Sequence, residues 1–134
     1  MNVFNMDCVS GMRKHIKNDS IDCVLTSPPY DNLRKYNGYS FDFEATALEL
    51  YRVLCTGGVI VWNVGDSVVN GSETGNSFRQ ALFFLDIGFN LHDTMIYEKN
   101  SSTFPASKSG CRYTQIFEYV FILTKGKPKT VNLI

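Results

Sequence analysis

The chain has 134 residues, and its thirteen basic and thirteen acidic side chains give it a net charge of zero at neutral pH. Hydrophobic residues make up 44% of the sequence, which excludes a disordered chain, and no apolar stretch reaches the length of a membrane span. We therefore expect one globular, cytoplasmic domain with no signal peptide and no membrane partner, whose affinity for nucleic acid must come from local groups of charges.

The first predicted elements are a short strand and a helix. Residues 3–5 predict the strand, and apolar residues at helical spacing over 9–16 predict the helix. Asp7 lies at the junction, where an acidic side chain can cap the N-terminus of the helix.

A proline pair ends the next predicted strand. The apolar run 21–26 is typical of a buried strand, and Ser27-Pro28-Pro29-Tyr30 follows it. Prolines donate no backbone N–H and hold φ fixed, so the chain must leave the sheet as a stiff loop. Ligands of open α/β sheets bind outside the carboxyl ends of the strands, where this loop would lie. The position favours a functional loop over a polyproline-type ligand or a phosphorylation site in a disordered tail.

The rest of the chain alternates between helices and strands. A helix that begins near residues 40–42 is expected to stop at Gly57-Gly58, which permit a left-handed C-cap, before a buried strand at 59–62. The loop 65–76 is rich in Gly, Ser and Asn, and we expect it to act as a lid. Asn63, Gly65 and Asp66 either line a cleft beside the Pro-Pro loop or simply end a strand.

The last elements predict an antiparallel pair. A helix over 78–85 ends at Gly88, and strands are predicted at 90–98 and 116–123. No helical segment separates the two strands, which favours a hairpin over a parallel crossover.

The cysteines argue against two kinds of chemistry. They show no Cys-x-x-Cys pair and no histidine at ligand spacing, so we expect reduced thiols and no metal site. A cysteine nucleophile that attacks carbon 5 of cytosine is expected directly after a proline. None of these cysteines follows a proline. The four are Cys8, Cys23, Cys55 and Cys111.

The run Asp22–Tyr30 resembles the catalytic motif, usually (Asp/Asn/Ser)-Pro-Pro-(Tyr/Phe), of DNA methyltransferases that modify exocyclic amines. Asn5-Met6-Asp7-Cys8 and the later Arg52-Val53-Leu54 with Gly57-Gly58 are similar to the subgroup whose chains begin with the catalytic half. The resemblance implies an α/β fold: part of a Rossmann-like, S-adenosylmethionine-dependent methyltransferase sheet, mostly parallel with an antiparallel C-terminal hairpin. It implies that residues 1–125 form the catalytic part of the domain, with a basic tail at 126–134.

The resemblance also implies roles for the motif. The Ser27 side chain and the Pro28 carbonyl would each accept an N–H of the target amine, Pro29 would hold the loop rigid, and Tyr30 would stack on a base flipped out of the duplex. Serine in the first position leans toward the N4 of cytosine rather than the N6 of adenine.

Other residues are implied to hold the two substrates. By resemblance, Asp7 and Cys8 recognise the adenine of S-adenosylmethionine. Basic side chains in two predicted loops are candidates for contacts with DNA phosphates. They are Arg34, Lys35, Lys108 and Arg112.

A region that the resemblance leads us to expect does not occur in the 134 residues. The family has a target-recognition region and then an (Asp)-Pro-Phe-x-Gly-(Ser/Thr)-Gly loop that holds the methionine part of the cofactor. We expect the chain to be a catalytic half or truncated form that alone binds the cofactor weakly or not at all and is catalytically silent. Its expected partner is either a second copy or a complementing chain that carries the missing loop. Two strands would also be missing beside strand 21–26, so its edge should be free and the chain should self-associate or displace its first strand.

Two other functions remain open at this point. The chain could be a non-catalytic DNA-binding or assembly module derived from such an enzyme, which the missing cofactor loop would favour. It could also methylate an RNA base or a protein glutamine, although glutamine methyltransferases typically carry Asn-Pro-Pro-Tyr, so Ser27 counts against that function.

Overall fold

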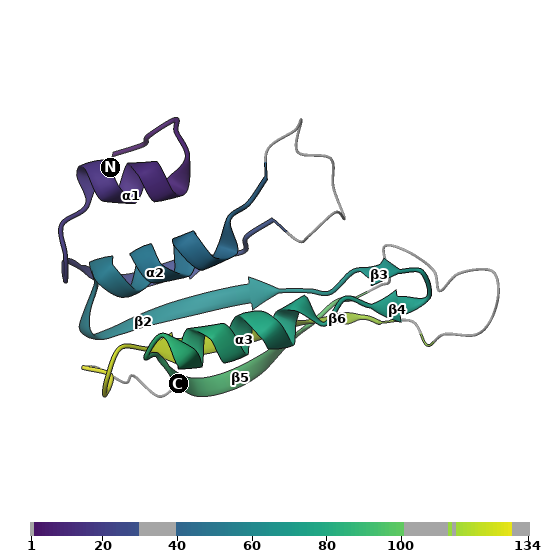
Figure 1. Ribbon diagram of the computed structural model, residues 1–134. Coiled ribbons are helices and arrows are strands. Elements are labelled where there is room, and N and C mark those ends of the chain that lie inside the picture. Colours follow the sequence, from purple (N-terminus) through teal and green to yellow (C-terminus); the bar gives the residue numbers. More distant parts are fainter. Residues whose placement is uncertain (1, 30–39, 101–112, 114, 130–134) are drawn as a thin grey trace.

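One four-stranded sheet organises the molecule (Figure 1). The computed structural model describes residues 2–29, 40–100, 113 and 115–129. The strands β1, β2 and β5 run in the same direction, whereas β6 runs antiparallel to both of its neighbours. Across the sheet the order is β1 (Ile21–Thr26), β2 (Leu54–Val64), β6 (Phe117–Thr124) and β5 (Asn90–Glu98).

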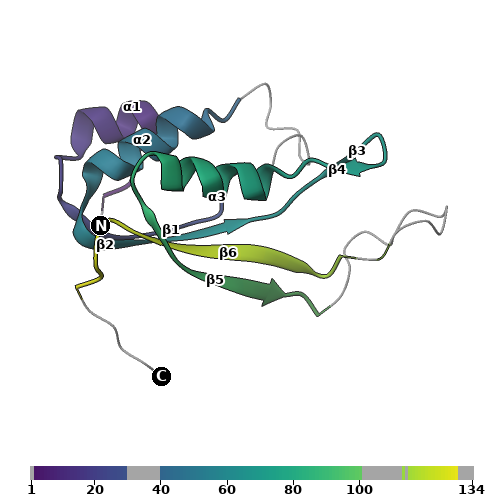
Figure 2. The same ribbon diagram turned by 60° about the horizontal axis from the view of Figure 1, so that its bottom comes forward.

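The helices of the described part lie together on one face of this sheet, as Figure 2 shows. A two-stranded hairpin of β3 (Val68–Val69) and β4 (Ser72–Glu73) extends from the carboxyl end of β2. The helices are α1 (Cys8–His15), α2 (Phe43–Val53) and α3 (Asn76–Asp86). The mixed α/β class and the antiparallel β5–β6 pair that the sequence predicted are therefore confirmed.

The core lies between β2, β6 and the helices α2 and α3. Alternate residues of β2 point into it, which is the pattern expected of a strand with one face buried. Trp62 is the largest of these, and its indole Nε1 donates a hydrogen bond to Gln80 Oε1 at 2.9 Å. Its ring packs edge-on against Phe84, with 5.1 Å between the ring centroids. Burial of the two aromatic rings fixes α3 over the centre of the sheet.

The predicted strand at residues 3–5 does not form. The local prediction of a strand is therefore wrong, and the alternative that the first strand is displaced is the one that the structure shows. Val3 is 80% exposed and, within the described chain, has no neighbouring strand with which to pair. In the described part of the chain β1 pairs with β2 alone, which confirms the expected free edge. A two-residue apolar segment without a partner strand cannot offset the entropy of ordering its backbone.

The predicted end of α2 is also wrong, because the helix ends at Val53 and not at Gly57-Gly58. The chain becomes extended at Leu54, and the two glycines lie within β2. Lys125 replaces the expected glycine cap: its ammonium donates to the carbonyls of Tyr51 and Leu54 at 2.8 and 2.9 Å. A cation at a helix C-terminus satisfies carbonyls that have no partner within the helix.

The described part of the basic tail is tied to the sheet. Lys129 N donates to the Gly57 carbonyl at 3.2 Å, and its ammonium lies 3.3 Å from Cys55 Sγ and 3.6 Å from an Asp22 carboxylate oxygen. The pKa of Lys129 is raised, first by its hydrogen bond to Cys55 and then by the charge of the Asp22 carboxylate. The pKa of Asp22 is lowered, first by the hydrogen bond that the Cys55 thiol donates to it and then by the Lys129 ammonium. No helix among the described residues is long and apolar enough to cross a membrane.

Candidate functional site

The proline pair lies at the carboxyl end of β1, as predicted. Thr26, the last residue of the strand, is level with Trp62 of β2, after which the backbone leaves the ladder. Pro28 is buried, Pro29 is half-buried and Ser27 is exposed. The stiff backbone therefore carries an accessible side chain on a fixed base, which suits a group that must be positioned precisely.

A cavity of about 350 Å³ opens beside this loop and reaches the start of α1. Ser27, Pro28 and Pro29 line it together with Cys8, so four of the five predicted site residues that the structure describes come together here. Asp7 is not among the lining residues, although it precedes Cys8 directly. The remaining walls are mostly apolar and come from Met6, Met12, Val24, Thr26, Phe41, Thr46, Leu50 and Trp62.

Asp7 caps α1, which confirms the structural role expected for it. Its carboxylate Oδ1 accepts a hydrogen bond from Ser10 N at 2.9 Å. Cys8 follows as the first helical residue, and its thiol lies 3.6 Å from the Thr46 hydroxyl of α2. The cap and this contact fix where α1 begins relative to the cavity.

The other end of α1 is held by a charged network. Arg52 of α2 donates to the carbonyls of Met12 and Ile16 at 2.9 and 3.1 Å. Glu49, whose side chain is 11% exposed, accepts from Arg52 at 2.7 Å and from Arg13 at 3.0 Å. Burial raises the pKa of Glu49, but the hydrogen bonds from both arginines outweigh it, so the net shift is downward. The ionised carboxylate thus joins α1 to α2.

The polar residues Asn63, near the end of β2, and Asp66, just after it, form structural contacts in the described chain. Asn63 Nδ2 donates to Glu118 Oε2 at 2.8 Å, and the same carboxylate pairs with Lys99 at 2.5 Å. Asp66 accepts from the backbone N–H of Ser77 at 3.1 Å and also bonds the Ser77 hydroxyl, so it caps α3. Neither Asn63 nor Asp66 lines the cavity beside the Pro-Pro loop.

The segment predicted to be a lid carries the hairpin β3–β4 and is joined to Asp66. The hydroxyl of Thr74 donates to Asp66 Oδ1 at 3.2 Å, and the Thr74 N–H donates to the Ser67 carbonyl at 2.9 Å. These bonds close the base of the hairpin. Lid motion stays a prediction.

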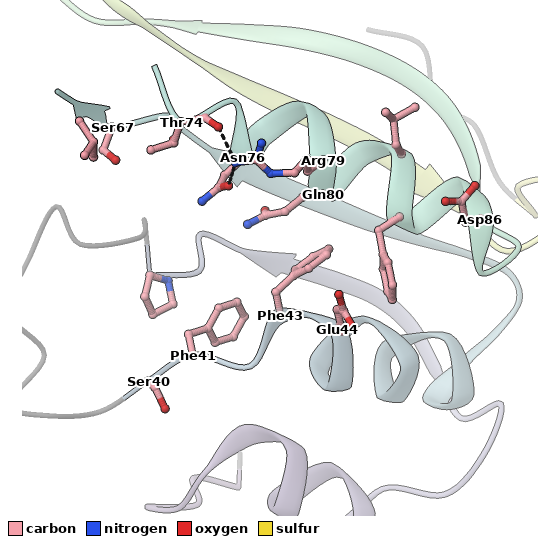
Figure 3. A pocket seen from close by; sticks show the side chains of 14 residues that line it. Ser40, Phe41, Phe43, Glu44, Ser67, Thr74, Asn76, Arg79, Gln80 and Asp86 are labelled. Carbon is pink, nitrogen blue, oxygen red and sulfur yellow. Dashed lines mark hydrogen bonds between the residues drawn. The ribbon is translucent and has the colours of Figure 1, made fainter. Parts of the chain in front are cut away.

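A second, larger cavity of about 900 Å³ lies between α2, α3 and the base of the hairpin (Figure 3). It shares Pro29 and Phe41 with the smaller cavity, so these residues form a wall between the two. Arg79 is held at its rim by the Thr74 carbonyl and the Asn76 side chain. Figure 3 shows Phe41 and Phe43 on the α2 side, opposite Gln80 and Arg79 of α3.

Several predicted site residues lie outside the described residues. They are Tyr30, Arg34, Lys35, Lys108 and Arg112. Among the described residues Cys8, Cys23 and Cys55 are free thiols, and no group of metal-binding side chains occurs there.

The sequence did not identify the apolar walls of the smaller cavity. Trp62 lay in the strand predicted to be buried and Leu50 in the predicted helix, with no functional role expected of either. Thr46 carried no signal, because a lone threonine on a helix has no distinctive spacing. The anchor of α1 by Glu49 and Arg52 was missed as well. An acidic residue three positions before an arginine on a helix gives a weak hint of an ion pair, but not of the carbonyls to which the arginine also donates.

Known proteins that resemble this chain are methyltransferases in sequence and in fold. Residues 21–134 match the sequence model of the N6 and N4 methyltransferase family, which is described as DNA methylase. The orphan methyltransferase M.BamHII of Bacillus amyloliquefaciens is 64% identical over 123 residues, which are 92% of this chain and 45% of that protein.

Solved structures share the architecture at lower identity. The PvuII DNA methyltransferase, described as cytosine-N4-specific, gives a TM-score of 0.72 with 21% identity, over 92% of this chain and 49% of that chain. A DNA modification methylase from Thermus thermophilus, in complex with S-adenosyl-L-methionine, gives a TM-score of 0.67 with 20% identity, over 96% of this chain and 54% of that chain. This chain therefore spans about half the length of each of these three proteins.

Proposed function

Because the chain belongs to the DNA methylase family of N6 and N4 methyltransferases, we propose that it is the catalytic half of an enzyme that transfers a methyl group from S-adenosylmethionine to an exocyclic amine of DNA. One observation carries the proposal: the Ser27-Pro28-Pro29 loop stands at the carboxyl end of β1 and lines a cavity with Cys8. This is the edge of an α/β sheet where ligands bind.

The smaller cavity fits part of the cofactor. Its volume of about 350 Å³ lies within the range of about 300–1,000 Å³ typical of small-molecule sites. Its walls are mostly apolar, as a flat adenine ring requires, and Cys8 and Thr46 supply polar atoms at the α1–α2 side. We assign adenine recognition to Cys8 and to the neighbouring Asp7. When bound, S-adenosylmethionine supplies an electrophilic methyl group.

The residues of the loop act on the amine. The hydroxyl oxygen of Ser27 and the carbonyl oxygen of Pro28 each accept one N–H of the target, which draws the nitrogen lone pair out of conjugation with the ring. The prolines fix both acceptors, so little reorganisation is needed in the transition state. Tyr30 stacks on the base, which must leave the duplex to reach the loop. Contacts with phosphates, which hold the DNA, come from Arg34, Lys35, Lys108 and Arg112.

Serine at the first motif position leads us to propose the N4 of cytosine as the target. The product distinguishes the two amines directly: nucleosides released from methylated DNA contain either N4-methylcytosine or N6-methyladenine, which mass spectrometry separates. The proposed setting is the bacterial cytoplasm, in restriction-modification or as an orphan enzyme, because the Bacillus relative is described as an orphan methyltransferase.

The test uses the chain fused to the part of M.BamHII that lies outside the matched region. Single-turnover transfer of a labelled methyl group to DNA is measured for the fusion and for Ser27→Ala. We expect the variant to lose about 10- to 1,000-fold in rate with little change in cofactor affinity, as for the removal of one hydrogen bond that strengthens in the transition state.

Ser72→Ala is the matched control, because Ser72 is an exposed serine of the hairpin outside both cavities. It should transfer methyl groups at the unchanged rate. An unchanged rate in folded Ser27→Ala protein would show that this loop is not the catalytic centre. DNA binding by an inactive fusion would favour the non-catalytic module.

A further inference from the structure

The larger cavity is separate from the groups that act on the target amine. Ser27 and Pro28, which carry the proposed acceptors, line the smaller cavity and do not line the larger one. The volume of the larger cavity, about 900 Å³, lies near the upper end of the range of about 300–1,000 Å³ that is typical of small-molecule sites. A molecule bound in it would therefore not be the base that receives the methyl group.

Gln80 of α3 presents a buried hydrogen-bond donor to this cavity. The residue is only 8% exposed, and its Oε1 accepts the hydrogen bond from Trp62 Nε1 at 2.9 Å. Because an indole N–H can only donate, this bond fixes the orientation of the amide, and Figure 3 shows the nitrogen end directed into the space between α3 and α2. Among the described residues Nε2 has no hydrogen-bond partner. A buried donor without a partner favours a ligand that brings an acceptor to it.

Arg79 supplies a fixed cation at the rim of the same cavity. Its Nη2 donates to the Thr74 carbonyl and to the Asn76 side chain, which hold the guanidinium in place. Its Nε and Nη1 have no partner within the part of the chain that the structure describes. A guanidinium offers these N–H groups as a fork that matches two oxygens of a phosphate. The side chain is exposed, so an anion reaches it from solvent.

Aromatic rings and carboxylates complete the walls. Phe41 and Phe43 are half-buried and lie across the cavity from α3 in Figure 3, where they offer stacking surfaces to a flat ring. Glu44 and Asp86 also line the cavity. Asp86 follows Arg79 by seven residues, which places it about 10 Å further along the helix axis. The carboxylates repel an anion from the rest of the cavity and can accept hydrogen bonds from an amino group.

We propose that the larger cavity is a second nucleotide-binding site, distinct from the site of methyl transfer, for a nucleotide whose base carries an exocyclic amine. The phosphate binds Arg79, and a ring nitrogen or carbonyl oxygen of the base accepts from Gln80 Nε2. The base stacks on Phe41, and its amine faces Glu44. A free mononucleotide and an unstacked nucleotide of a DNA strand offer the same chemistry. Because Pro29 lines both cavities, the bound nucleotide adjoins the catalytic loop.

The test titrates deoxycytidine monophosphate into the chain and follows the protein by NMR. Trp62 is the single tryptophan, so its indole N–H gives one resonance, which should shift when the nucleotide bonds Gln80. Arg79→Gln should weaken binding by about 10- to 100-fold, as for the loss of charge-assisted hydrogen bonds. Lys14→Gln is the matched control, because it makes the same change of charge at an exposed residue outside both cavities. It should bind with unchanged affinity.

Gln80→Glu tests the buried donor. It keeps an oxygen that accepts from Trp62 and replaces Nε2 by a second oxygen, which repels the acceptor of the base. We expect binding to weaken by about 10-fold or more. Gln115→Glu, at an exposed glutamine outside both cavities, is its control and should have no effect. Should Gln80→Glu fail to fold, the exposed Arg79 carries the test alone.

Competition identifies the source of the nucleotide. A short DNA strand that displaces the monophosphate at lower concentration than free nucleotide does assigns the site to DNA, and a strand that does not displace it assigns the site to free nucleotides. S-adenosylhomocysteine should leave the monophosphate bound, because its adenine belongs in the smaller cavity.

Several results would overturn the proposal. They are the absence of any shift of the indole resonance, equal affinities of the Arg79 and Lys14 variants, and displacement by S-adenosylhomocysteine. Loss of binding in Ser27→Ala would place the nucleotide at the catalytic loop and would also overturn it. Failure of the proposed methyl transfer looks different, because nucleotide binding is measured without the cofactor and would persist.

Discussion

Glu49 offers the sharpest test of how the cofactor side of the site is built. Replacement by glutamine keeps the shape of the side chain but removes the charge that Arg52 and Arg13 share at 2.7 and 3.0 Å. A hydrogen bond to an ionised group contributes about 1 kcal/mol more than a neutral one. Two such bonds would give about 2 kcal/mol, which we reduce to about 1–2 kcal/mol because Arg13 is largely exposed to solvent.

The assay is thermal unfolding of the chain at neutral and acidic pH. A loss of that size in a domain of this length lowers the Tm by about 4–10 °C. The pKa of Glu49 is lowered below its ordinary value of 4.5, so the carboxylate stabilises the fold fully above that pH. Its contribution is lost as the pH falls through the lowered pKa of the folded state. The difference in Tm between the native chain and Glu49→Gln should therefore shrink in acid.

Glu44→Gln is the control, because it makes the same change in the exposed first turn of the same helix. Its Tm should fall by less than that of Glu49→Gln, because an exposed charge in the first turn contributes only about 0.3–1 kcal/mol through the helix dipole. Equal Tm values for the Glu49 and Glu44 variants would refute the reasoning. So would a difference that persists unchanged in strong acid, since the charge of Glu49 would then not be its source.

Two further changes test the elements around the site by urea denaturation. Asp66→Ala removes the cap of α3 and should lower the free energy of unfolding by about 0.5–2 kcal/mol. Asp86→Ala, at the C-terminal end of that helix, should not lower it, because a negative charge there opposes the helix dipole. Equal losses of stability in the two variants would contradict the capping role. Gly57→Ala should cost more than Gly71→Ala. Both positions have positive φ, +82° and +79°, but the new Cβ of residue 57 would lie 3.1 Å from the Lys127 carbonyl whereas that of residue 71 meets nothing. Similar losses would show that the tail does not press on β2.

Much of the fold follows from local patterns in the sequence. The strand 21–26, the helices and the antiparallel pair of β5 and β6 were predicted because each carries a strong periodicity or a clear break. The failures have a common physical cause. The strand at 3–5 depends on a partner strand, and the end of α2 depends on Lys125, which lies 74 residues beyond Tyr51 in the sequence. Long-range contacts of this kind leave no local signal.

The candidate site divides in the same way. The Pro-Pro motif was recognisable because the residues that define it, Ser27 to Tyr30, are consecutive in the sequence. Its neighbours in the cavity come from separate elements that the fold brings together, and no spacing in the sequence joins Cys8 to Trp62. The larger cavity was not predicted for the same reason.

The way α1 is attached bears on how firmly the site is built. The helix contains no fully buried residue. Partly buried Met12 packs it against the core, and the Cys8–Thr46 contact at one end and Arg52 at the other hold it by polar contacts. Polar contacts of this kind can rearrange at lower cost than a packed core. The Pro-Pro loop is held differently, because the buried Pro28 and the pairing of β1 with β2 fix it to the sheet. The two walls of the smaller cavity therefore differ in how firmly they are attached: α1 depends largely on polar contacts, whereas the loop depends on the sheet.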